Sequence, residues 1–211
     1  MSLPIVYGRA LVLIVAFAIT SKYYYDNYYQ KKRKSMRKEI HEVIMFSHGT
    51  KVIKKSKYSK CMITESMDRL LYYLNSPKYS LDICMYVFTN IDLANAIMKL
   101  HYKGVHIRMI IDADMAYSNG SNVWRFEKLG VPVRWMKSTN LMHHKFCLID
   151  THSEDSIATP LVIGGSLNWT NQALHGNWED VFVTSQKEIV SQYKAEFERL
   201  WSMFRPVVEL I

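Results

Sequence analysis

Two short polar segments in the second half of the chain carry side chains suited to phosphodiester chemistry. The first places His143 and Lys145 two residues apart and ends, after an apolar run, at Asp150. The second places Ser166 and Asn168 two residues apart. An imidazole can act as a nucleophile or a proton donor near neutral pH. An ammonium, a hydroxyl and an amide can hold phosphate oxygens and stabilise their charge. The pattern H-x-K-x4-D followed by G-S-x-N therefore predicts a phosphodiesterase site that needs no metal and no cofactor.

Short apolar runs are expected to position these side chains. Residues 146–149 and 161–163 form two such runs, each typical of a buried strand. Side chains two apart on a strand share a face, so the imidazole and the ammonium should point the same way, as should the hydroxyl and the amide. Gly164 and Gly165 lack side chains and are expected where a substrate backbone comes close. The four polar groups should therefore converge on one point.

The complete arrangement resembles the HKD signature of the phospholipase D superfamily. In that family a Glu follows the second segment and orients the catalytic His, and Glu179 stands at the matching place here. The resemblance implies a phospholipase D-like fold and assigns catalytic roles to His143, Lys145, Asp150, Ser166, Asn168 and Glu179.

The chain contains this motif once, whereas larger members of the superfamily carry two copies whose His residues act together. A single-motif chain is expected to form a homodimer, so that two His143 side chains face each other across a two-fold axis. One imidazole would attack phosphorus and the other would protonate the leaving oxygen.

The first 38 residues predict a membrane anchor. Residues 3–20 form an apolar stretch of 18 residues, interrupted only by Gly8 and Arg9, which is close to the minimum for a bilayer span. A Tyr-rich stretch over residues 23–29 and a basic cluster over residues 31–38 follow, as expected for a membrane interface and its cytoplasmic side. The sequence therefore predicts an anchor and basic juxtamembrane segment over residues 1–38 and a cytosolic catalytic domain over residues 39–211.

A cleaved secretory signal is the alternative for this segment, because residues 16–18 read Ala-Phe-Ala, as at a cleavage site. Dense positive charge just downstream disfavours export. The three cysteines are odd in number and scattered, unlike a disulfide framework. Asn168 also begins a glycosylation sequon, and a glycan there would block the site. A retained anchor is the favoured interpretation.

The formal charge of +8 is distributed unevenly. Residues 1–38 hold eight Lys and Arg residues against one Asp, and the remainder is nearly balanced. A local cluster between the first expected strand and the first expected helix consists of Lys51, Lys54, Lys55, Lys57 and Lys60. A lysine-rich loop can simply be solvated. Beside a phosphodiesterase groove it would instead bind a polyanion such as single-stranded RNA.

The remaining sequence alternates between strand and helix patterns. Strands are expected at residues 42–46, 79–88, 106–111, 131–136 and 179–184, and helices at residues 62–75, 92–102, 122–129 and 187–204. This order predicts an α/β domain with a mixed β-sheet flanked by helices on both sides, preceded by one N-terminal transmembrane helix. Asp92 is the expected cap of the second helix. Asp112 and Asp114 are interpreted as structural and not as metal ligands.

The single motif, the anchor and the length resemble the Zucchini family of mitochondrial phospholipases D over essentially the whole chain. The resemblance implies attachment to mitochondrial outer-membrane lipid and work with other proteins that make PIWI-interacting RNAs. Family members carry a Cys/His zinc module between the first strand and the first helix. Here that region offers only His48 and Cys61, too few for a structural zinc that takes four ligands, so no zinc is expected.

Three functions follow from these patterns. The favoured one is a single-strand-specific endoribonuclease that acts through a phosphohistidine and uses the lysine cluster to bind substrate. The alternative is a phospholipase that hydrolyses cardiolipin to phosphatidic acid, and the third is an inactive membrane scaffold, which the intact motif disfavours. A lipase needs an apolar channel, whereas a nuclease for single strands needs a narrow, positive groove.

Overall fold

The computed structural model describes residues 3–35, 39–152 and 158–206, with the backbone alone described for residues 3–10 and 30–35. The chain divides into two compact units, Met1–Lys38 and Glu39–Ile211. The first unit contains a single helix, α1 (Leu3–Ser35). In the described part of the chain, no helix combines the length and the apolarity that a membrane crossing requires. The predicted transmembrane helix is thus not confirmed, and the side chains of its first half, residues 3–10, lie outside the described set.

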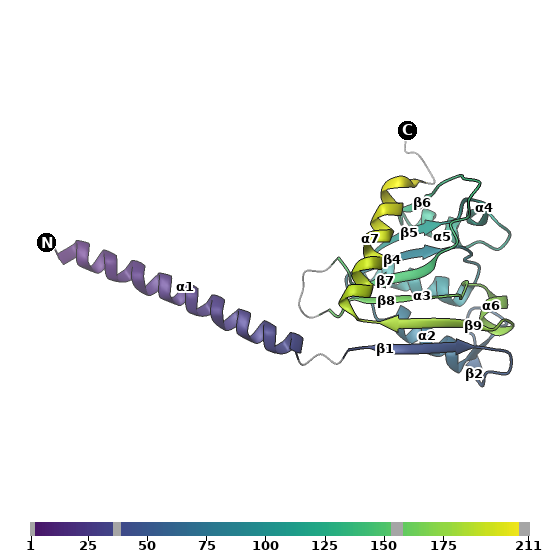
Figure 1. Cartoon of the computed structure of the whole chain (residues 1–211), viewed down its shortest axis with the longest axis horizontal. Coiled ribbons are helices and arrows are strands. Elements are labelled where there is room, and N and C mark those ends of the chain that lie inside the picture. Colours follow the sequence, from purple (N-terminus) through teal and green to yellow (C-terminus); the bar gives the residue numbers. More distant parts are fainter. Residues whose placement is uncertain (1–2, 36–38, 153–157, 207–211) are drawn as a thin grey trace. The chain divides into compact units, whose positions relative to one another are not determined.

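An eight-stranded sheet forms the centre of the second unit (Figure 1). Its strands run in the order β1-β9-β8-β7-β4-β5-β6-β10. Their bounds are β1 His41–Phe46, β4 Ser80–Met85, β5 His106–Ile111, β6 Val133–Trp135, β7 Lys145–Ile149, β8 Leu161–Gly165, β9 Glu179–Thr184 and β10 Arg205–Pro206. The pairs β4–β5 and β5–β6 are parallel and the other neighbours are antiparallel. The predicted mixed sheet is confirmed.

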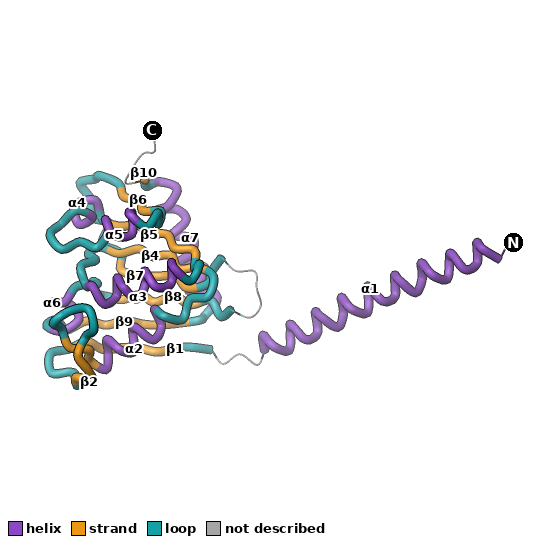
Figure 2. Tube along the Cα trace, turned by 180° about the vertical axis from the view of Figure 1, so that it is seen from behind, coloured by secondary structure: helices purple, strands orange, loops and turns teal. Residues whose placement is uncertain are grey.

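Helices cover both faces of this sheet, as Figures 1 and 2 show from opposite sides. One face carries α7 (Lys187–Met203), and the other carries α2 (Glu65–Leu74), α3 (Ile91–Tyr102) and α5 (Val123–Lys128). Two short helices, α4 (Ala113–Ala116) and α6 (Asn171–His175), lie in connections. Buried side chains such as Leu70 and Ile97 fill the larger core, and Phe146 and Phe197 belong to the smaller core beneath α7. The predicted two-sided α/β arrangement is therefore confirmed.

Capping side chains set where two of the helices begin. The Thr64 hydroxyl accepts a hydrogen bond from the Met67 amide, so α2 starts at Glu65. The Asn90 side chain accepts a hydrogen bond from the Leu93 amide at 2.9 Å, so α3 starts at Ile91. The prediction that Asp92 caps this helix is wrong, because Asn90 lies two residues earlier and already occupies the cap.

The lysine-rich segment folds as a two-stranded hairpin of β2 (Val52–Lys55) and β3 (Met62–Thr64). Two of its lysines form ion pairs with α2, Lys51 with Glu65 at 3.3 Å and Lys54 with Asp68 at 2.6 Å. The other three, Lys55, Lys57 and Lys60, are exposed and form no ion pair with any residue that the structure describes. The hairpin therefore presents three unpaired positive charges to solvent.

Candidate active site

The motif side chains come from the ends of three neighbouring strands. Lys145 begins β7, Ser166 follows the end of β8, and Glu179 begins β9. Because β8 lies between β7 and β9 and is antiparallel to both, these three ends meet at one edge of the sheet. The end of β4 joins them, since Met85 pairs with Lys145. The sheet topology thus brings the two sequence segments together, and we call this edge the catalytic edge.

His143 and Lys145 are in direct contact at the catalytic edge. Lys145 Nζ lies 3.2 Å from His143 Nδ1 and donates a hydrogen bond to the His143 carbonyl at 2.8 Å. The prediction that these two side chains lie together is therefore confirmed. Burial lowers the pKa of Lys145, and the charge of Glu179 opposes this shift.

Tyr86 is a further member of the site that the sequence did not reveal. Its ring packs on the His143 ring with centroids 4.6 Å apart, and the Lys145 ammonium lies 5.3 Å from the Tyr86 ring centroid. Tyr86 directly follows β4, so its place depends on the pairing of β4 with β7. The sequence signal was limited to its position at the end of an apolar strand.

The contact with Lys145 constrains the ring proton of His143. A charged ammonium only donates hydrogen bonds, so Nδ1 must accept and the proton of a neutral ring must lie on Nε2. Donation of a proton to a leaving group needs the imidazolium, which carries a proton on both nitrogens. For Nε2 to attack phosphorus, the ring proton must instead lie on Nδ1. Both roles therefore need a hydrogen-bond acceptor that faces Nδ1 in place of the ammonium.

Glu179 is held by its neighbours and not by His143. Ser166 Oγ donates a hydrogen bond to Glu179 Oε2, and Asn177 Nδ2 donates one to Oε1 at 2.9 Å. Among the described residues, no hydrogen bond joins Glu179 to His143, so the orientation of the imidazole by this carboxylate is not observed in the single chain. Asn177 was not predicted as a site residue, because an Asn before a strand carries no specific signal.

Asn168 lies in a segment that is attached to the end of β4. The Trp169 amide donates to the Val87 carbonyl at 3.0 Å, and the Trp169 carbonyl accepts bonds from the amides of Thr89 and Asn90. The Asn168 side chain is half-buried, and its carbonyl oxygen is buried without a hydrogen-bond partner among the described residues. A buried amide oxygen of this kind needs a hydrogen-bond donor.

Asp150 lies outside the catalytic edge, which corrects its predicted catalytic role. It follows β7, and this strand of five residues, roughly 16 Å long, separates it from the end that Lys145 occupies. The Asp150 carboxylate is buried and accepts hydrogen bonds at 2.8–3.1 Å from the amides of Lys78, Tyr79 and Ser80. Its function is to hold the turn from which β4 begins.

Gly164 and Gly165 make room for β9 and not for a substrate. A Cβ atom on Gly164 would lie 2.9 Å from the Phe182 ring. Gly165 has a φ of 150°, and a Cβ atom there would lie 2.2 Å from the Asp180 carbonyl oxygen. The expectation that these glycines admit a substrate backbone is therefore wrong, because protein atoms fill the space.

Asp112 positions the residue that precedes His143. Its carboxylate accepts hydrogen bonds from the amides of Asp114 and Met115 at the start of α4, and from the Met142 amide at 3.0 Å. Met142 is also held by Cys84, whose sulfur lies 3.4 Å from the Met142 sulfur. The structural interpretation of Asp112 is confirmed, and it extends to the segment that carries His143.

A separate ionic cluster lies between the sheet and α7. In the part of the chain that the structure describes, Asp82, His152 and Glu198 are the one group of three whose ligand atoms, within 4.8 Å of one another, could hold a metal ion. Arg108 binds these acids instead, with bonds of 2.7 and 2.9 Å to Asp82 and 2.7 Å to Glu198. Burial opposes the charge on Arg108, but these bonds outweigh it and raise its pKa. The guanidinium therefore supplies the positive charge that a metal ion would bring.

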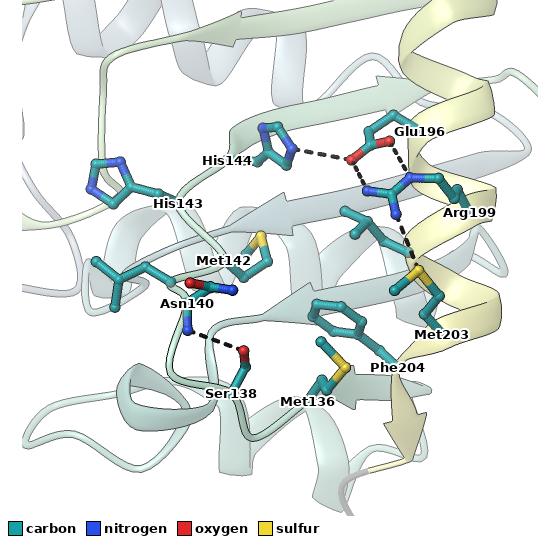
Figure 3. Close-up of a pocket in the computed structure, with 12 residues that line it drawn as sticks. Met136, Ser138, Asn140, Met142, His143, His144, Glu196, Arg199, Met203 and Phe204 are labelled. Atoms are coloured by element: carbon teal, nitrogen blue, oxygen red, sulfur yellow. Dashed lines mark hydrogen bonds and ion pairs between the residues drawn. The ribbon is translucent and has the colours of Figure 1, made fainter.

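Two hollows flank the catalytic edge. One, of about 400 Å³, is lined by His143 and His144 and by residues of α7 (Figure 3). The other, of about 500 Å³, is lined by Glu179, by Trp178, which is 82% exposed, and by the end of β1. Phe46 ends β1 and pairs with Glu179, so the lysine hairpin leaves the sheet at this same edge.

Comparison with known proteins gives a consistent result. The family described as "Cardiolipin synthase, PLD-like domain" matches residues 70–201. A "Mitochondrial cardiolipin hydrolase" of Drosophila melanogaster is 34% identical over 202 residues, covering 82% of this chain and 79% of that protein. Proteins of the same name from Chlamydomonas reinhardtii and Homo sapiens are 39% and 38% identical, over 66% and 67% of this chain. The matched parts span 59% and 53% of those two relatives.

Solved structures share the fold. A phospholipase D family member, Nuc from Salmonella typhimurium, superposes with a TM-score of 0.63 at 19% identity, covering 82% of this chain and all of that one. NucT from Helicobacter pylori superposes with a TM-score of 0.59 at 23% identity, covering 66% of this chain and 89% of that one. At such identities the likeness concerns the fold alone.

Proposed function

Because the chain belongs to the mitochondrial cardiolipin hydrolase (Zucchini) family of the phospholipase D superfamily, we propose that it hydrolyses the phosphodiester of cardiolipin. The observation that carries this proposal is the contact between His143 and Lys145 beside Ser166 and Glu179. These residues provide an imidazole for the reaction and a cation for phosphate oxygens, which are the two requirements of phosphoryl transfer without a metal.

The reaction takes two steps. Nε2 of one His143 attacks phosphorus, and the bond to the central glycerol oxygen breaks while a second imidazole gives that oxygen its proton. Water then attacks the phosphohistidine and restores the imidazole. Cardiolipin and one water thereby become phosphatidic acid and phosphatidylglycerol. Lys145 stabilises the charge that develops on the phosphate oxygens.

A homodimer would supply the second imidazole. The contact with a charged Lys145 leaves Nδ1 of His143 as an acceptor, which does not suit the proton donor of the pair, because that donor is an imidazolium with a proton on both nitrogens. The imidazole that attacks also needs its proton on Nδ1, so both roles need an acceptor at Nδ1 in place of the ammonium. A second copy of the chain can provide this acceptor, so we assign the complete site to two chains.

A second candidate function is cleavage of single-stranded RNA. The observation that favours it is the hairpin at the catalytic edge, where Lys55, Lys57 and Lys60 are exposed and unpaired. Such lysines contact phosphates without reading sequence. If RNA is the substrate, the products should carry 5′-phosphate and 3′-hydroxyl ends, because the imidazole and not the ribose hydroxyl attacks. This activity would place the chain among proteins that make PIWI-interacting RNAs.

The relatives' names support a mitochondrial location for this chain. We propose that it acts at the cytosolic side of the outer membrane, where the basic residues 31–38 would meet anionic lipid. Import of a fusion of residues 1–38 to a fluorescent protein, followed by protease treatment of intact mitochondria, tests this placement. Protection of the fluorescent protein from protease would contradict it.

A side-by-side assay tests the proposed activity. The full chain in detergent is given cardiolipin in mixed micelles, or single-stranded RNA, at matched concentrations with EDTA present. Phosphatidic acid should appear with the native chain and not with His143→Ala. RNA cleavage without phosphatidic acid would replace the first function with the second, and loss of activity in EDTA would contradict metal-independent chemistry.

A further inference from the structure

The pocket between His143 and α7 has a mainly apolar wall (Figure 3). Its apolar side chains are Met136, Leu141, Met142, Leu200, Met203 and Phe204. Met142, Leu200 and Phe204 are buried and form its floor, whereas Leu141 and Met203 are 58% and 48% exposed and form its rim. Since His143 lines the same pocket, an occupant would lie directly beside the catalytic imidazole.

The charged groups of this pocket already bind one another. Arg199 donates two hydrogen bonds of 2.8 Å to Glu196, and His144 Nε2 lies 3.2 Å from the same carboxylate. The bonds to Arg199 lower the pKa of Glu196, and Glu196 raises the pKa of Arg199, so both remain charged and together neutral. A ligand recognised by hydrogen bonds, such as a nucleobase, would find these donors and acceptors occupied. The surface that remains for a ligand is apolar apart from Ser138, whose hydroxyl accepts a hydrogen bond from the Asn140 amide, and the exposed Asn140.

Methionine is unusually frequent among the apolar side chains of this wall. Met136, Met142 and Met203 come from the segment before His143 and from the end of α7. A thioether on an unbranched chain adapts its shape to flexible ligands better than a branched side chain does. These properties suit a long, flexible hydrocarbon chain better than a rigid ring.

We propose that this pocket binds an acyl chain of the phospholipid that His143 cleaves. The inference rests on the proposed cardiolipin hydrolase function and deepens it, because it names the part of the molecule that selects a lipid over a water-soluble diester. The phosphate lies at His143 and Lys145, and the hydrocarbon enters the pocket over the rim formed by Leu141 and Met203.

Replacing rim residues of the pocket by Glu tests whether an acyl chain occupies it. Leu141→Glu and Met203→Glu alter exposed side chains and are compared with the native full chain, on cardiolipin in mixed micelles and on bis(p-nitrophenyl) phosphate. The ratio of kcat/KM for cardiolipin to kcat/KM for the small diester should fall roughly tenfold or more in each variant. The matched control is Tyr102→Glu, which adds the same charge to a side chain of α3 that is 74% exposed. Both of its rates should stay within about twofold of native.

A labelled substrate gives a second readout. Cardiolipin with a photoreactive diazirine in one acyl chain should label residues 136–142 and 199–204 of the native chain, and Met203→Glu should lose this labelling. Native ratios in both rim variants, with labelling elsewhere, would overturn the inference. So would rim variants that slow RNA cleavage and leave cardiolipin turnover unchanged, because the occupant would then be a nucleotide. A native chain that cleaves the small diester but no cardiolipin would reject the proposed function itself, without reference to any variant.

Discussion

We expect the ionisation of Lys145 to set how activity at the catalytic edge depends on pH. Burial lowers its pKa and Glu179 raises it, and only the charged form stabilises phosphate oxygens. The value of kcat/KM should therefore fall as pH rises through the pKa of Lys145. Glu179→Gln removes the charge that raises this pKa, so the basic limb of the pH–rate profile should move to lower pH. Hydrolysis of bis(p-nitrophenyl) phosphate across the alkaline range measures it.

Ser166→Ala is the matched control for this shift. It removes the hydrogen bond to Glu179 but keeps the carboxylate charge near Lys145. The rate should fall while the basic limb stays nearer its native position than in Glu179→Gln. A limb that does not move in Glu179→Gln would show that Lys145 does not control it.

Asp150 is a structural residue of the motif, unlike the residues that we propose to be catalytic. Asp150→Ala leaves three backbone amides without their acceptor and places Ala at a φ of 53°. The free energy of unfolding should therefore fall by about 2–4 kcal/mol. Asp150→Asn keeps an acceptor and tolerates this backbone conformation, so its cost should be smaller. Urea unfolding measures both variants. A hundredfold loss of kcat in folded Asp150→Asn would instead restore a catalytic role.

At the scale of elements, β4, β5 and α7 are joined by the Arg108 cluster. Asp82 is fully buried, and Arg108→Met would leave its carboxylate without its main cationic partner. The free energy of unfolding should fall by about 3–5 kcal/mol. Met retains part of the apolar contact that Arg108 makes with Phe197 and Trp201. The double variant Asp82→Leu/Arg108→Met should recover most of the loss, because it removes both charges.

The pH dependence of stability gives an independent check on this cluster. Arg108 lowers the pKa of Glu198, so this carboxyl stabilises the fold above its unfolded pKa and ceases to do so as pH falls through its folded pKa. In Arg108→Met this contribution to the loss of stability at acid pH should disappear. The midpoint temperature of thermal unfolding, measured between neutral and acid pH, tests this. An equal dependence of the midpoint on pH in the native chain and in Arg108→Met would contradict the assigned pairing.

The elements of the site were predictable where an apolar run lies next to polar residues of the motif. The strand Glu179–Thr184 was predicted with its observed bounds, and the contact of His143 with Lys145 followed from their spacing. Asp150 was expected at the end of the strand that follows His143 and Lys145, but the resemblance to the HKD signature grouped it with the catalytic residues. Tyr86 was missed because strand pairing, a long-range property, places it against His143. The β2–β3 hairpin was missed because its strands are short and rich in Lys.

At the scale of the whole molecule, we expect the single motif to make activity depend on dimer formation. If each site uses two copies of His143, activity should fall on dilution below the dissociation constant of the dimer. Mixing native chain with excess His143→Ala should place native chains in inactive heterodimers, so activity per native chain should fall. Subunit exchange is confirmed first with two affinity tags. Activity that follows only the amount of native chain would indicate a site complete in one subunit.

The covalent intermediate tests the central claim most directly. Native chain mixed with ³²P-labelled cardiolipin and quenched in alkaline detergent, where phosphohistidine survives, is digested and its labelled peptide is sequenced. The label should be found on His143, should form in EDTA and should be absent from His143→Asn. A label on another residue, or turnover of cardiolipin that persists in His143→Asn, would contradict the mechanism in which His143 attacks phosphorus.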